Sequence, residues 1–155
     1  MGEFTIRDAR PCDADTIVGF NTKMAMETEG RSLAPELINP GVRAVLEDPE
    51  KGRYWVAEVD DQVVGQLMVT YEWSDWRNGV FWWIQSVFIR DDCRRRGIFS
   101  ALHRHVETLA RSTPRVCGLR LYVERDNRRA QRTYETLGMT SPGYQVMEID
   151  FRENP

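Results

Sequence analysis

The sequence has few of the features that mark secreted, metal-binding or membrane-spanning proteins. Its three cysteines, Cys12, Cys93 and Cys117, are scattered, without the even number of a disulfide framework or the spacing of metal ligands. No apolar run approaches the roughly 20 residues needed to span a bilayer. Residues 1–7 lack the basic-then-apolar pattern of a secretion signal. We therefore expect a soluble, cytoplasmic protein with free thiols, no metal and no membrane contact.

An excess of positive charge is also absent. The chain has 155 residues and a formal net charge of −3 at pH 7, whereas a general nucleic-acid-binding protein usually carries a basic face. Its hydrophobic content of 41% and charged content of 29% are ordinary for a globular protein. No internal repeat, low-complexity segment or linker divides the chain. These properties predict one domain over residues 1–155 with a substantial core.

Hydrophobic periodicity predicts that strands and helices alternate along the chain. Strands are expected at residues 4–7, 54–59, 62–72, 80–89, 119–123 and 145–151. Helices are expected at residues 13–29, 35–49, 98–112 and 127–137, with Asp13 as a suitable N-cap for the first. Pro40 leaves open a kinked or split second helix. This order predicts an α/β domain with a mixed sheet and helices on both faces.

Residues 87–102 join a strand to a helix through an arginine-rich loop. Residues 87–89 end a β-branched and aromatic run, residues 94–97 read Arg-Arg-Arg-Gly, and Ile98 begins the apolar stripe of the helix. Such a loop directs unpaired backbone N–H groups and the positive end of the helix dipole at one place. A phosphate or pyrophosphate can bind there, and arginines would add charge-assisted contacts. We therefore predict that a phosphorylated cofactor binds here; a solvated charge cluster is the alternative.

Two motifs follow one another in the second half of the chain. The first is Arg94-x-x-Gly97-x-Phe99, and the second is Asn127-x-x-Ala130 leading to Tyr134-Glu135-x-Leu137-Gly138. Together they resemble the GNAT superfamily of acetyl-CoA-dependent N-acetyltransferases, whose loop reads Arg/Gln-x-x-Gly-x-Gly/Ala. Phe99 departs from this pattern, because a small residue is usual there. The resemblance spans residues 81–151 and implies a mixed, mostly antiparallel sheet of about six or seven strands, flanked by about four helices and splayed at the coenzyme site.

The resemblance also implies roles for individual residues. The cosubstrate would be acetyl-CoA, with its pyrophosphate on the loop amides and its pantetheine arm along the preceding strand. The coenzyme-binding residues implied are Val87, Phe88, Ile89, Arg94, Arg95, Arg96, Gly97, Ile98, Phe99 and Asn127. Tyr134 aligns with the family's tyrosine that protonates the departing thiolate, with a buried structural tyrosine as the alternative. An N-cap role is the alternative for Asn127, and both roles can hold together.

The sequence does not identify the general base. Many family members carry a glutamate on the strand before the loop, where this chain has Gln85 and Ser86. A water held by Gln85, or a carboxylate such as Glu27, Glu29 or Glu72, could take the proton instead. We therefore predict Gln85 and Glu27 as substrate-binding residues.

Acids and aromatics alternate in the segments expected to line the acceptor pocket. They include Met24, Met26, Glu27, Glu29, Glu72, Trp73, Asp75, Trp76, Trp82 and Trp83. This combination suits a cationic amine through charge pairing and cation–π contact. We expect an enzyme that transfers an acetyl group from acetyl-CoA to an amine, with a small cationic primary amine favoured. The alternatives are a protein N-acetyltransferase and a catalytically silent acyl-CoA-binding module, and the resemblance leaves a homodimer open.

Overall fold

The computed structural model describes residues 2–152. The chain forms two compact units, Met1–Tyr122 and Val123–Pro155. Within residues 2–152, the first unit contains a sheet, three α-helices and two short 3-10 helices, and the second contains one α-helix. Among residues 2–152, no helix is both long and apolar enough to cross a membrane.

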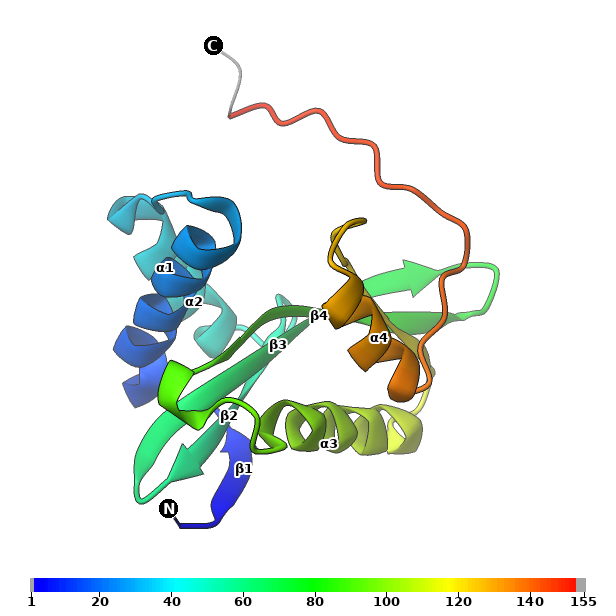
Figure 1. Ribbon diagram of the computed structural model, residues 1–155. Coiled ribbons are helices and arrows are strands. Elements are labelled where there is room, and N and C mark those ends of the chain that lie inside the picture. The colour runs from blue at the N-terminus through cyan, green and yellow to red at the C-terminus, as the bar shows by residue number, and fades with distance from the viewer. Residues whose placement is uncertain (1, 153–155) are drawn as a thin grey trace. The chain divides into compact units, whose positions relative to one another are not determined.

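A single mixed sheet forms the centre of the first unit (Figure 1). Its strands are β1 (Phe4–Asp8), β2 (Arg53–Val59), β3 (Gln62–Ser74), β4 (Gly79–Ile89) and β5 (Val116–Leu121), in that order across the sheet. Neighbours from β1 to β4 are antiparallel, and only β4 and β5 are parallel. The mixed, mostly antiparallel sheet was predicted. Residues 2–152 contain five strands, however, rather than six or seven.

Helices cover both faces of this sheet, as predicted. They are α1 (Ala14–Glu29), α2 (Pro35–Glu47) and α3 (Ile98–Ser112). Alternate residues of β2 face opposite ways, so Trp55 packs in a core with α3 whereas Tyr54 packs in a smaller core with α1 and α2. The second helix is not split, because α2 continues through Pro40.

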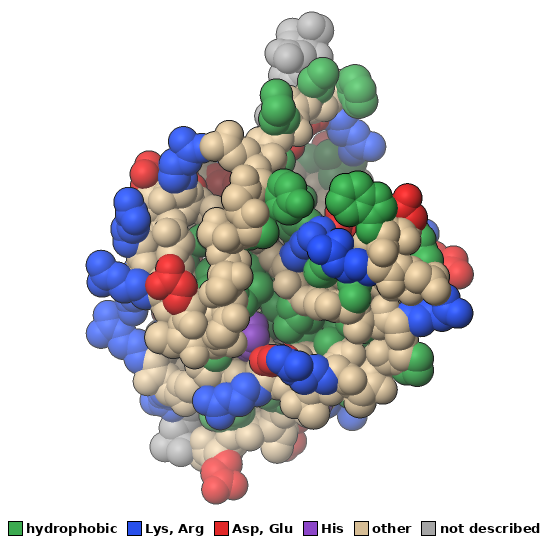
Figure 2. Space-filling view, turned by 90° about the vertical axis from the view of Figure 1, so that its right-hand side faces the viewer, with side chains coloured by type: hydrophobic (Ala, Val, Ile, Leu, Met, Phe, Trp, Pro, Cys, Tyr) green, Lys and Arg blue, Asp and Glu red, His purple; other side chains and the backbone are tan. Residues whose placement is uncertain are grey.

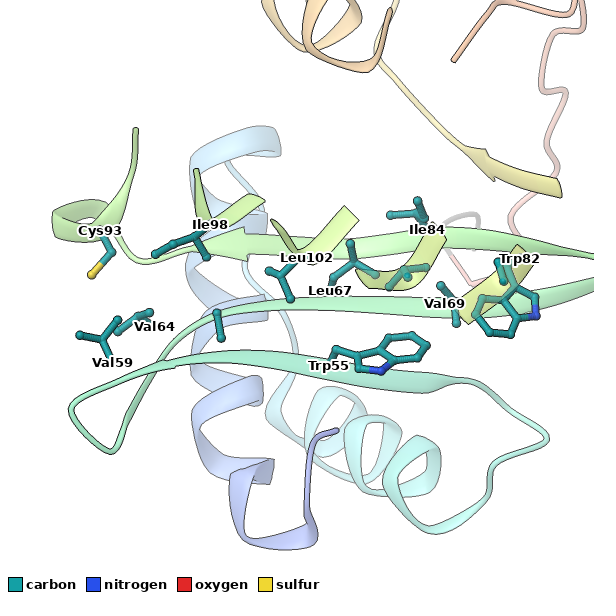
Figure 3. Close-up of a cluster of buried hydrophobic side chains, with 13 residues drawn as sticks. Trp55, Val59, Val64, Leu67, Val69, Trp82, Ile84, Cys93, Ile98 and Leu102 are labelled. Atoms are coloured by element: carbon teal, nitrogen blue, oxygen red, sulfur yellow. The ribbon is translucent and has the colours of Figure 1, made fainter. Parts of the chain in front are cut away.

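The larger core lies between the sheet and α3 (Figure 3). Trp55, Leu67 and Leu102 are fully buried in it. The apolar positions of α3 recur every four residues, at Leu102, Val106 and Ala110, so one stripe of the helix lies on the sheet. Removing a buried leucine side chain from such a core typically costs about 2–5 kcal/mol. This packing fixes the start of α3 relative to β4.

The prediction that the Asp13 side chain caps the first helix is wrong. Asp13 occupies the N-cap position of α1 but makes no side-chain cap hydrogen bond. Its carboxylate instead accepts hydrogen bonds from the Arg7 guanidinium at 2.8 and 3.0 Å and from the Arg10 N–H at 2.7 Å. The Arg7 partner is the main reason that the pKa of Asp13 is lowered. The ion pair therefore ties β1 to the start of α1.

The second unit is built on α4 (Arg128–Thr136). Asn127 caps this helix, because its Oδ1 accepts a hydrogen bond from the Ala130 N–H at 3.1 Å, which confirms the N-cap alternative. Gly138 follows the helix with a φ of 91°, a conformation that favours glycine.

The strand predicted at residues 145–151 is wrong: residues 145–150 form no regular secondary structure. Apolar side chains of this segment stand on the surface instead (Figure 2), and Met147 and Phe151 are at least 90% exposed. Alternation along the chain indicates a strand only where a neighbouring strand supplies hydrogen-bond partners, and no strand of the described residues pairs with this segment.

Candidate functional site

The sheet opens between β4 and β5. Their parallel ladder runs from the Val80–Val116 pair to the Ile84–Leu121 pair, where β5 ends. β4 continues through Ile89. Backbone groups of residues 85–89 on this side therefore have no ladder partner in β5. The family resemblance implied strands that separate beside the coenzyme, and the sheet opens here between β4 and β5.

A β-bulge lies immediately beyond the end of this ladder. In the β3–β4 pairing, Gln66 lies opposite Phe88 and Met68 lies opposite Gln85, so two residues of β4 oppose Leu67 alone. The first of these two, Ser86, has a φ of 51°, a left-handed conformation that non-glycine residues rarely adopt. Bulges redirect backbone groups and are frequent beside active sites.

The loop after β4 leads into a helix start that suits an anion. Gly97 is the N-cap of α3 with a φ of 80°, so it offers no capping side chain, and the first turn of α3 contains no acid. By contrast, the first turns of α1 and α2 carry Asp15 and Glu36. The first N–H groups of α3 have no intrahelical acceptor. A Cβ built on Gly97 would meet nothing within 4 Å, so the space that a bound phosphate needs is open.

Arg94 is held by the protein rather than extended into solvent. Its Nε donates to the Ile89 carbonyl at 2.9 Å, and its Nη2 lies 2.9 Å from both Glu27 Oε2 and Asp91 Oδ1. The guanidinium also lies over the Phe88 ring, 5.4 Å from its centroid. Arg94 therefore joins the end of α1 to the loop. Arg95 and Arg96 are exposed side chains of the same loop.

The structure places the two predicted substrate-binding residues in different contacts. Glu27, near the end of α1, forms the ion pair with Arg94. Gln85, on β4, donates from Nε2 to Thr70 Oγ1 on β3. Glu72, another acid considered as a base, pairs with Arg120 of β5. Each of these side chains thus has a protein partner, which the sequence did not reveal.

Phe99 turns its ring toward the body of α3. The centroid of the Phe99 ring lies 6.2 Å from that of His103, one helical turn later. His103 is 1% exposed, and neither ring nitrogen has a hydrogen-bond partner in the part of the chain that the structure describes. Burial lowers the pKa of His103. We did not predict a role for this histidine from the sequence, although its position between the apolar residues Leu102 and Val106 of α3 indicates burial.

Tyr134 lies in α4, within the second unit. Its side chain is partly buried, and burial raises the pKa of its phenol. The phenol therefore keeps its proton at neutral pH, which a proton donor must do.

Comparisons with known proteins agree with these features. The sequence model of the Acetyltransferase (GNAT) family matches residues 21–139. The structure of a possible acetyltransferase from Clostridium difficile 630 is 46% identical, covers 96% of this chain and 98% of its own, and has a TM-score of 0.90. No curated protein matches the sequence.

More distant structures share the fold. A ribosomal-protein-alanine N-acetyltransferase from Brucella melitensis biovar Abortus 2308 is 17% identical, with a TM-score of 0.76 and coverage of 96% of this chain and 99% of its own. A predicted acetyltransferase from Clostridium acetobutylicum, solved with acetyl-CoA, is 14% identical, with a TM-score of 0.77 and coverage of 98% and 99%. The family match and the 46% identical structure lead to one conclusion: the chain belongs to the acetyltransferase (GNAT) family and is an N-acetyltransferase.

Proposed function

We propose that this enzyme transfers the acetyl group of acetyl-CoA to a small cationic primary amine. The observation that carries the proposal is the start of α3, which has neither a capping side chain nor an acid and follows an arginine-rich loop beside the open edge of β4. We propose further that both units belong to a single acetyltransferase domain over residues 1–155.

The coenzyme would be held mainly by backbone groups. The amides of residues 97–99 would bind the pyrophosphate at the positive end of the α3 dipole. Arg95 and Arg96 would add charge. The backbone of Val87 and Ile89 would bond the pantetheine arm. The side-chain amide of Asn127 would contact the same arm through Nδ2, because its Oδ1 already caps α4.

The chemistry requires a proton donor at the sulfur. Acetyl-CoA would supply the acetyl group as a thioester. Once the ammonium group has lost a proton to solvent, the neutral amine would attack the thioester carbon, and its nitrogen would lose a second proton to solvent as the C–S bond breaks. We propose that the Tyr134 phenol gives its proton to the departing thiolate. Its raised pKa suits this role, because the phenol stays protonated over the pH range in which the amine acceptor can lose a proton.

Two observations support the proposal of a cationic acceptor. The Trp83 and Tyr122 rings lie 4.5 Å apart, and Tyr122 is 60% exposed, so they offer an aromatic surface for cation–π contact. Glu27 pairs with Arg94 while both side chains are more than 40% exposed. Such exposed pairs contribute only about 0–1 kcal/mol. A phosphate that attracts Arg94 would therefore leave the Glu27 carboxylate available to an ammonium group. We assign Gln85 as a second, uncharged side chain that would bind the same acceptor.

A protein amine is the second candidate acceptor. Trp73 and Trp76 at the end of the β3–β4 hairpin are 57% and 89% exposed, and exposed aromatics of this size often mark a surface that contacts a larger partner.

A thiol-release assay with acetyl-CoA and an amine panel tests these alternatives. The panel would contain diamines and polyamines, neutral amino sugars, and peptides with free N-termini. We expect the highest kcat/KM for the small cationic amines, and a decrease at high salt, because charge pairing is screened. A higher kcat/KM for peptides would favour the protein acceptor. Binding of acetyl-CoA without thiol release from any acceptor would favour the silent module.

Two further properties belong to this proposal. A cytoplasmic location fits three cysteines that are all free thiols. A homodimer fits the exposed apolar side chains of the C-terminal segment, since a second copy could cover them; they are Tyr144, Val146, Met147, Ile149 and Phe151. Light scattering coupled to gel filtration would give the mass, and a monomer at micromolar concentration would contradict the dimer.

A further inference from the structure

Four polar residues meet beneath the bulge of β4, and we name them the bulge cluster: Asn21, Tyr54, Gln66 and Ser86. Gln66 Nε2 donates to the Ser86 carbonyl at 3.0 Å and to Asn21 Oδ1 at 2.9 Å. Asn21 Nδ2 donates to the Tyr54 hydroxyl at 3.2 Å. The cluster therefore joins α1, β2, β3 and β4.

The cluster contains one buried polar atom that the stability of the core does not explain. Gln66 is fully buried, and Asn21 and Tyr54 are each 4% exposed. Within the described residues, Gln66 Oε1 has no hydrogen-bond partner, which is unfavourable for a buried amide oxygen. An apolar side chain of similar volume would remove this orphan oxygen but would leave the Ser86 carbonyl and Asn21 Oδ1 without their donor. The amide nitrogen is thus the group of Gln66 that holds the Ser86 carbonyl.

This bond sets the direction of one peptide group at the coenzyme site. The carbonyl of Ser86 and the N–H of Val87 belong to the same planar peptide and point in opposite directions. Because Gln66 draws the carbonyl toward the cluster, the Val87 N–H is directed away from it. Ser86 also holds a left-handed φ of 51°, a strained conformation that persists only where the surroundings enforce it.

We propose that the bulge cluster is a positioning device, in which Gln66, oriented by Asn21 and Tyr54, presents the Val87 N–H to the acetyl-CoA thioester. This inference rests on the proposed function. Gln66, Asn21 and Tyr54 are positioning residues, because they act through the Ser86–Val87 peptide and do not themselves contact substrate.

The test compares Gln66→Leu with a matched control, Val64→Ala, in the full chain. Val64 is 1% exposed on the same strand and packs in the larger core, outside the cluster. For Gln66→Leu we expect a lower melting temperature, because the Ser86 carbonyl and Asn21 Oδ1 lose their donor, together with a kcat at least tenfold lower and an unchanged KM for the amine. For Val64→Ala we expect a lower melting temperature and an unchanged kcat. An unchanged kcat in Gln66→Leu, or an equal loss in both variants, would overturn the proposal.

Tyr54→Phe supplies an independent readout, and decides the question if Gln66→Leu does not fold. Loss of the hydroxyl frees Asn21 while the Gln66–Ser86 bond stays, so we expect a kcat loss of threefold or more. The double variant should lose no more than Gln66→Leu alone, because both changes act on one peptide. Additive losses, or a wild-type kcat for Tyr54→Phe, would refute the cluster. A wild type that binds no acetyl-CoA would instead refute the proposed function.

Discussion

Gly97→Ala tests the coenzyme-binding loop most selectively. In the protein alone, the added methyl group meets nothing within 4 Å, and the only penalty is a φ of 80° for a non-glycine residue, about 1–2 kcal/mol. With acetyl-CoA bound, the same methyl group would occupy the space where the pyrophosphate approaches the first amides of α3. Loss of one charge-assisted hydrogen bond, about 1.5–3 kcal/mol, weakens binding roughly 10- to 150-fold.

Gly30→Ala is the matched control for this prediction. Gly30 also has a positive φ, of 60°, and open space where a Cβ would lie, but it follows α1 rather than preceding α3. Isothermal titration with acetyl-CoA should therefore give a wild-type Kd for Gly30→Ala and a Kd at least tenfold higher for Gly97→Ala, with similar losses of melting temperature in the two variants. Equal Kd values in both would refute the placement of the pyrophosphate at Gly97.

Three other perturbations test separate parts of the account. Tyr134→Phe should lower kcat about 100-fold or more in the thiol-release assay while the Kd for acetyl-CoA stays the same; an unchanged kcat would exclude Tyr134 as proton donor. Glu27→Gln should change the free energy of unfolding by no more than about 1 kcal/mol, because the pair with Arg94 is exposed, yet raise the KM for a cationic amine; a neutral amine should show no change. The pKa of His103 is lowered in the folded protein, so the unfolded chain binds a proton at this residue more readily. Denaturant titrations should therefore show that the free energy of unfolding decreases as the pH drops below about 6.5, by up to about 1.4 kcal/mol per pH unit. His103→Leu should remove that part of the slope, and an identical slope in the variant would contradict the assignment.

Helices and central strands follow from local periodicity, and the sequence predicted them well. The apolar stripe of α3 and the runs that became β2, β3 and β4 were each recognisable within a short window. Strand pairing is not local. β5 begins at Val116, three residues before the predicted start, because its limits depend on the register with β4. The apolar alternation of residues 145–151 similarly could not reveal whether a partner strand lies beside it.

In the candidate site too, local features could be predicted from the sequence, whereas contacts between distant residues could not. Glycine after three arginines predicted a helix start without a capping side chain, and Gly97 is the N-cap of α3, because backbone geometry there depends on neighbouring residues. The partner of Arg94 could not be predicted, since Glu27 lies 67 residues away in sequence. The contacts of Gln66 depend on two other elements, α1 and β4, and a glutamine within a strand gives no sign of them. Long-range polar contacts of this kind are fixed only when the whole core packs.

The central claim is that the first amides of α3 bind the coenzyme's pyrophosphate. Backbone amide chemical shifts of the isotope-labelled protein, followed during titration with acetyl-CoA, test it directly. We predict that the amide resonances of Gly97, Ile98 and Phe99 shift most, together with those of Val87 and Ile89 on β4. Saturable binding that leaves these five resonances in place and shifts others would contradict the account.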